Sequence, residues 1–307
     1  MKHATIAFLG IVLACAAADP AISQPQAEGV VATAPKRLGD DPKNVIGQFV
    51  QSYLKSATLS DGKIAQWKSG ICARTYGLSQ DQYNQFVTDR VENTAAEVGI
   101  NLQPSPCRLN VEIIFTDKPQ DFLSRVNGLG ARLLGATLSQ SDAAQNMRYP
   151  VQAWYNTATR DNNGSLIQDN QDSPVPTTTA NSVLQNFSSA NFASSTGSRI
   201  TNGQSSELSH IYVVADTNKT QEFSLGAIAD YITVLIFSQS QDFDNCKAIP
   251  SIANLVSPLC NADLKPKGMT DADLAYLKAI YRTNSDTGIQ KQGIFITNQI
   301  VDSLSLK

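Results

Sequence analysis

Apolar residues recur at helical spacing in several parts of the chain. The clearest case is residues 79–98, where Ser79 and Gln82 have the spacing of a capping box and Gly99 is typical of a helix C-cap. The same spacing predicts further helices over residues 45–54, over part of residues 119–137, and over residues 270–281, which open with a second capping pattern. Residues 291–304 are predicted to end the chain in a short amphipathic element.

Alternating apolar and polar residues predict strands in other segments. The alternation is clearest over residues 109–116, and residues 71–76, 151–159 and 208–215 are also predicted to be strands. A strand, a helix and a strand in succession are typical of a βαβ-like unit. Residues 221–239 are apolar on nearly every side and rich in β-branched residues, so their pattern leaves helix and strand both open.

These elements predict an α+β fold, a single domain with a small mixed sheet and packed helices over residues 43–307. Residues 24–42 are rich in Gln, Ala, Pro and Asp, and we predict a flexible lead-in there. Residues 162–206 are dominated by Ser, Thr, Asn, Gln and Gly and predict a long polar loop. A structureless loop of that length is unusual inside a compact domain, so it would serve as a flap or a linker.

The N-terminal residues 1–23 are typical of a secretory signal peptide. Lys2 gives a basic start, and the apolar core over residues 6–14 is too short to span a membrane. Small residues precede a cleavage site before Gln24. We therefore expect a periplasmic or secreted protein of a Gram-negative bacterium. An alternative interpretation is a lipobox that ends at Cys15, which would give the mature protein a lipid anchor.

Four cysteines remain if Cys15 is lost with the leader. An even number of cysteines in an exported chain predicts two disulfides, and four cysteines allow three pairings. Cys246 and Cys260 are close in sequence and flank a short stretch with two prolines, which favours pairing them and leaves Cys72 with Cys107. The alternative, a zinc site of four thiolates, lacks any Cys-x-x-Cys motif.

Composition and motifs exclude several classes of function. The formal net charge of -3 leaves no excess of Lys and Arg to face a phosphate backbone, so we expect no nucleic-acid partner. The longest apolar run after the leader, residues 225–237, is short and contains Asp230, so no transmembrane segment is predicted in the mature chain. The sequence has no Walker A loop, no Gly-x-Ser-x-Gly and no His-Glu-x-x-His, and we predict no cofactor and no metal.

Four residues remain as weak catalytic candidates. His210 is the only histidine left after export. Asp230 and its neighbour Tyr231 lie in the most apolar stretch of the chain, where a carboxylate is costly unless it is paired and where its pKa can rise into the range of an acid or base. Asp216 ends a predicted strand. For each of them the alternative is a structural role, such as a hydrogen bond to a neighbouring backbone turn.

Several motifs together resemble a group of uncharacterised exported proteins of alphaproteobacteria. The resemblance covers about residues 45–285, and these segments carry it: Ile64–Trp67, Ile71–Cys72, residues 79–98, Cys107–Thr116, Ala153–Tyr155, His210–Asp216, Ala229–Tyr231 and Thr270–Tyr281. The layout is also similar, more distantly, to zincin-like domains of unknown function. That resemblance would place Ala229–Tyr231 where zinc ligands fall, but residues 221–239 contain no histidine, which implies a domain without metallopeptidase activity.

Two functions follow as expectations. The first is a non-catalytic envelope domain that binds an envelope protein or a glycan, because no catalytic constellation is evident and a long polar loop is available for recognition. The alternative is a carboxylate-dependent hydrolase acting on envelope glycans or peptides. It requires two carboxyl groups about 5–10 Å apart in a cleft, such as Asp230 facing Asp216 or Glu112.

Overall fold

The computed structural model describes most of the chain. The described residues are 41–54, 59–60, 62–129, 146–160, 166–168, 204–240 and 245–305. The predicted signal peptide, Cys15 and nearly all of the predicted lead-in lie outside the described residues, as does most of the predicted loop.

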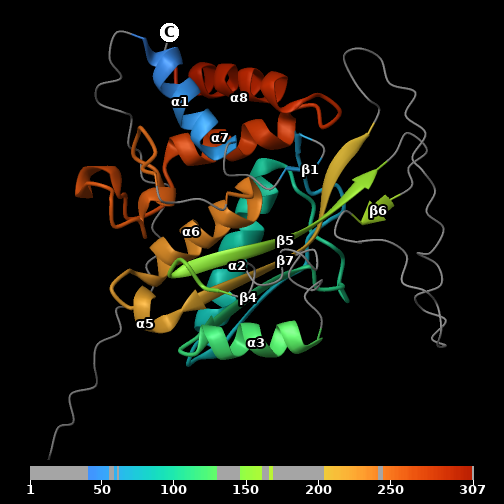
Figure 1. Cartoon of the computed structure of the whole chain (residues 1–307), viewed down its shortest axis with the longest axis vertical. Helices are drawn as coiled ribbons and strands as arrows, with labels where there is room; N and C mark the ends of the chain where they lie inside the picture. Colours follow the sequence, from blue (N-terminus) through green and yellow to red (C-terminus); the bar gives the residue numbers. More distant parts are fainter. Residues whose placement is uncertain are drawn as a thin grey trace, which may run out of the picture.

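A five-stranded mixed sheet forms one half of the molecule (Figure 1). In spatial order the strands are β3 (Ala73–Tyr76), β4 (Val111–Thr116), β7 (Ser205–Asp216), β5 (Val151–Arg160) and β6 (Leu166–Gln168). The first three strands run parallel, whereas β5 is antiparallel to both β7 and β6. The predicted α+β class is therefore confirmed. The predicted polar loop over residues 162–206 is wrong at two places, because β6 lies within it and its last residues begin β7.

The predicted βαβ unit is confirmed by β3, helix α2 (Asp81–Val98) and β4, whose two strands are parallel. The helix ends at Gly99, whose φ of 89° lies in the left-handed region that glycine adopts at no cost. The predicted capping box of Ser79 is wrong. The N-cap is Gln80, without a side-chain cap bond, because the carboxamide of Asn84 instead holds the preceding turn by accepting the Leu78 N–H at 3.2 Å.

Helices cover the two faces of the sheet. Helix α6 (Leu225–Ser238) packs with α2 in the main core, and nearly all of its residues are buried. Burial on every side explains why its sequence shows no clear period. On the opposite face, Leu123 of α3 (Pro119–Leu129) packs against Trp154 and Val214 in a smaller cluster.

A second layer of helices lies beyond α6 (Figure 1). It consists of α1 (Pro42–Leu54), α7 (Asp271–Arg282) and α8 (Ile289–Ser303), and α8 packs against both of the others. The predicted capping box at the start of α7 is confirmed, since Thr270 and Asp273 each bond the other's backbone N–H. The small elements β1 (Leu59–Ser60), β2 (Lys63–Ile64), α5 (Thr217–Thr220), η4 (Ile252–Asn254) and η5 (Ala262–Leu264) complete the described structure.

Both predicted disulfides are confirmed. The Cys72–Cys107 bond joins the start of the βαβ unit to the segment that leads into β4. The Cys246–Cys260 bond closes a segment that follows α6 and packs beside α1. In the chain-entropy account, each bond stabilises the fold by roughly 2–4 kcal/mol, because it restricts the unfolded chain.

Candidate binding groove

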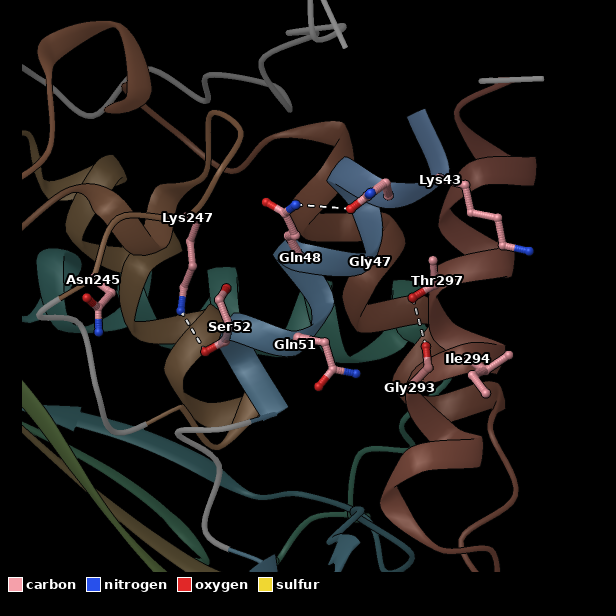
Figure 2. Close-up of a pocket in the computed structure, with 11 residues that line it drawn as sticks. Lys43, Gly47, Gln48, Gln51, Ser52, Asn245, Lys247, Gly293, Ile294 and Thr297 are labelled. Carbon is pink, nitrogen blue, oxygen red and sulfur yellow. Dashed lines mark hydrogen bonds between the residues drawn. The ribbon is translucent and has the colours of Figure 1, made fainter. Parts of the chain in front are cut away.

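A groove of about 870 Å³ runs over the outer face of α1 (Figure 2). Helix α1 forms its floor, α8 forms one wall, and the segment that begins at Asn245 forms the other. The residues that line it are Lys43, Asn44, Gly47, Gln48, Gln51, Ser52, Asn245, Lys247, Gly293, Ile294 and Thr297. Volumes of roughly 300–1,000 Å³ are usual for ligand sites.

Gly293 lies where α8 meets α1 at this groove. A Cβ atom on Gly293 would lie 2.8 Å from Leu54 Cδ1 and 3.2 Å from Gln51 Nε2, so a larger residue there would have to displace the ends of these two side chains. On the floor, a Cβ atom on Gly47 would lie 4.0 Å from Thr297 Cγ2, an ordinary van der Waals contact. Of the two glycines, Gly293 is therefore the one at which a side chain would disturb the packing of α1 against α8.

The wall opposite α8 is fixed to α1 by Lys247. This side chain is 1% exposed, and its ammonium group donates to the Ser52 carbonyl at 3.3 Å, as Figure 2 shows. The same Nζ atom lies 4.3 Å from the centre of the Tyr53 ring, a distance suited to a cation–π interaction. Lys247 directly follows Cys246, so the disulfide and the buried cation position this wall together.

A buried hydrogen-bond network supports α1 from below. Asp273 is fully buried, and its carboxylate accepts bonds from the Ser251 hydroxyl at 2.5 Å and from the Ile252 N–H at 2.9 Å. Its Oδ2 also accepts the Thr270 N–H at 3.0 Å. The Tyr53 hydroxyl lies 3.1 Å from the Ser251 oxygen. Burial raises the pKa of Asp273, and these hydrogen bonds oppose the rise.

The groove exposes polar side chains that are free to bind a ligand. Within the described residues, the side chains of Lys43, Gln51 and Asn245 make no hydrogen bond or ion pair, and all three are exposed. The Gln48 carboxamide donates one bond to Asn44 at 3.0 Å and keeps the rest of its capacity. No acid, histidine or cysteine is found among the lining residues. The groove thus offers hydrogen bonds and positive charge but no acid–base pair.

Asp230, a catalytic candidate from the sequence, is held in a structural arrangement. Its side chain is 1% exposed and forms a two-point ion pair with Arg90, whose Nη2 donates to Oδ2 at 2.8 Å. The same Oδ2 accepts the Met269 N–H at 2.8 Å. This carboxylate joins α2, α6 and the start of α7. Its neighbour Tyr231 is fully buried, and burial raises the pKa of its hydroxyl well above the ordinary value.

Asp216 has a local role at the end of β7. It is the N-cap of α5, where its carboxylate accepts the Asn218 N–H at 3.0 Å and lies 3.5 Å from the Lys219 ammonium. The partners of Asp216 and Asp230 do not overlap, so the structure does not bring these two carboxylates together in one site.

His210 does acquire a carboxylate partner. Its Nε2 lies 3.0 Å from Glu112 Oε1, and its ring centre lies 4.4 Å from that of Tyr212. Glu112 and Tyr212 are direct neighbours across β4 and β7. The pairing of β5 with β7 shifts register next to His210, because Asn156 pairs with His210 and Thr157 with Leu208. Burial lowers the pKa of His210, and the nearby Glu112 opposes that effect.

The sequence-based interpretation missed the groove, although one signal was present. Asn44, Gln48 and Gln51 recur at helical spacing on the face of α1 opposite its apolar residues. This pattern marks a polar face, but nothing in the sequence indicates that α8 and the Cys246–Cys260 segment flank it.

Within the described ranges, no three His, Cys, Asp or Glu side chains gather closely enough to hold a metal ion. Among the described helices, none has both the length and the apolar character needed to cross a membrane. Comparison of the chain with protein-family models, curated proteins and solved structures gave no match. The resemblance to exported alphaproteobacterial proteins and to zincin-like domains stays a prediction.

Proposed function

We propose that the protein is an exported, non-catalytic binding domain of the cell envelope and that it holds an envelope protein or glycan in the α1 groove. The observation that carries the proposal is that Lys43, Gln51 and Asn245 face the groove without partners within the described residues. Polar groups that bind nothing in the chain can bind a ligand without first breaking an internal bond.

Two further observations support this proposal over hydrolysis by a carboxylate pair. Asp230 is paired with Arg90 and accepts a backbone N–H. Asp216 lies beside Lys219 and also accepts a backbone N–H. The lining residues of the groove also include no carboxylate. The two disulfides support export, because such bonds persist mainly in oxidising compartments.

The proposal is tested by binding of the mature protein to defined envelope components. Purified peptidoglycan fragments and peptides from envelope proteins serve as probes, measured by titration calorimetry. We expect Lys43→Glu to weaken binding at least fivefold. Lys291→Glu is the matched control, since Lys291 is an exposed lysine of α8 that does not line the groove. Equal effects of the two substitutions would contradict a binding site in the groove.

A second candidate function, a hydrolase, rests on the Glu112–His210 pair. If Nε2 donates to the carboxylate, Nδ1 keeps its lone pair and can act as a general base. Hydrolysis of envelope glycans or peptides that is lost in both His210→Gln and Glu112→Gln would favour this function. Activity that survives either change would remove the pair from consideration.

A further inference from the structure

We infer that the ligand of the α1 groove is an extended, acidic peptide segment of about four residues. This inference rests on the proposed binding function and narrows it to one class of ligand. It depends on the dimensions of the groove, on the kind of side chains that line it, and on their charge.

The length of the floor fits a short extended chain. From Lys43 to Ser52 the lining stretch of α1 covers about 13 Å, at roughly 1.5 Å per helical residue. An extended chain advances roughly 3.3 Å per residue, so about four residues span the same distance. The volume of about 870 Å³ lies within the range of usual ligand sites.

Carboxamide side chains suit the backbone of a peptide. Each carboxamide presents N–H donors and a carbonyl acceptor, the same groups that a peptide bond presents. Asn44, Gln48 and Gln51 share one face of α1, because residues three and four apart are neighbours on a helix surface. Asn245 offers a fourth carboxamide from the opposite wall. Main-chain bonds of this kind give affinity without demanding a particular sequence.

The absence of aromatic residues from the lining argues against a sugar site. Such sites are lined mainly by apolar and aromatic side chains. Of the eleven lining residues, none is aromatic and Ile294 is the one large apolar residue. A sugar ring would therefore find no aromatic ring to stack on among these residues.

The charge of the groove selects an acidic ligand. Lys43 is an exposed cation at one end, and the buried ammonium of Lys247 adds positive potential at the wall. Asp41, two residues before Lys43, accepts the Asn44 N–H at the start of α1 and does not line the groove. Asp242 and Asp244, which precede Asn245, lie outside the described residues. Glutamate or aspartate in the peptide would meet attraction here, and the attraction would weaken in high salt.

The test measures how tightly two sets of fluorescent eight-residue peptides bind to the full mature protein. One set has a fixed central pair of glutamates, and the matched set has glutamines at those positions, with all other positions varied alike. We expect the acidic set to bind at least fivefold more tightly by fluorescence anisotropy. Lys43→Glu should remove that preference, whereas Lys291→Glu should keep it. N-methylation of the central peptide bonds should weaken binding at least tenfold.

A second pair of substitutions tests the carboxamides. Gln51→Ala should weaken acidic-peptide binding about threefold or more, and Gln290→Ala, on an exposed glutamine outside the groove, should leave it unchanged. Thermal melting of each variant excludes a folding defect.

An acidic oligosaccharide, oligogalacturonate, serves as the competing probe. If it binds through the groove and the peptides do not, the inference is wrong and the proposed function stands. If either probe binds but the groove substitutions have no effect, both are wrong. If no peptide binds, the inference is overturned, and the calorimetry with envelope components then decides the proposed function.

Discussion

The two faces of α1 differ in how their polar groups are satisfied. On the inner face, Tyr53 is fully buried and its hydroxyl meets Ser251 above the Asp273 carboxylate, so that each polar group there has a partner. On the outer face, Lys43 and Gln51 have none within the described residues. Because one short helix carries both faces, a change on one face can be compared directly with a change on the other.

This difference indicates where stability and where recognition are encoded. A buried polar group without a partner costs about 1–3 kcal/mol, so the inner network has to stay complete. An exposed polar group in water carries no such cost, and substituting it usually changes stability by less than about 0.5 kcal/mol. Inner-face substitutions should therefore change folding, and outer-face substitutions should change binding alone.

The largest effect is expected for Asp273→Ala. This change removes the acceptor of the Ser251 hydroxyl and of two buried backbone N–H groups, and we expect it to lower the free energy of unfolding by about 3–5 kcal/mol. Chemical denaturation measures the loss. Gln51→Ala, on the outer face, is the matched comparison and should change the free energy by no more than about 0.5 kcal/mol. Similar losses in the two variants would abolish the distinction between the faces.

The second effect concerns the buried ion pair of Arg90 and Asp230, for comparison with the hydrogen-bond network around Asp273. Arg90→Met leaves the Asp230 carboxylate buried without its cation, and we expect a loss of about 3 kcal/mol. The double variant Arg90→Met, Asp230→Asn removes the charge as well and should recover part of that stability. Denaturation of these two variants and of Asp230→Asn alone gives the coupling between the two side chains. Additive losses would show that the ion pair contributes little.

The third prediction separates the groove wall from the rest of the fold. Replacing Cys246 and Cys260 by Ser should cost about 2–3 kcal/mol of stability and should also weaken peptide binding, because Lys247 is no longer held beside Tyr53. Replacing Cys72 and Cys107 by Ser is the control, with a comparable loss of stability and unchanged binding measured below the melting temperature. Unchanged binding in both pairs would contradict the role assigned to the wall.

The smallest effect concerns His210, which lies on neither face of α1. Because burial lowers its pKa, the unfolded chain takes up a proton first as the pH falls below the ordinary value of 6.5. The stability that neutral His210 provides is therefore present above pH 6.5 and is lost as the pH falls toward the folded-state pKa. Between pH 7 and pH 5 the melting temperature of the native protein should fall about 2 °C further than that of His210→Gln. Parallel curves would indicate that His210 does not contribute.

The elements that the sequence predicted well are those whose pattern of apolar and polar residues matches their buried and exposed faces in the fold. The predictions for residues 79–98 and 109–116 agree with α2 and β4 within a few residues. Each of these elements has one buried and one more exposed face, which its apolar and polar positions follow. Residues 221–239 stayed ambiguous, since a helix buried on all sides has no polar face to reveal its period. Strand β6 lies in a Ser- and Asn-rich segment and depends on pairing with β5, which no local pattern reports.

The candidate site was harder to predict for a related reason. Asp230 was noticed because a carboxylate stands out in an apolar run, but its partner Arg90 lies on another helix and has nothing unusual around it in sequence. The groove likewise combines α1, α8 and the Cys246–Cys260 segment, which are distant along the chain. Only the polar spacing on α1 was visible beforehand, and it gave no indication of the walls.

The Cys246–Cys260 disulfide beside α1 makes binding in the groove depend on the redox state of the chain. One wall of the groove contains Asn245 and Lys247, which flank Cys246, so while Cys246 and Cys260 are reduced this wall lacks its covalent attachment. The proposed recognition surface would then be completed only once Cys246 and Cys260 have been oxidised.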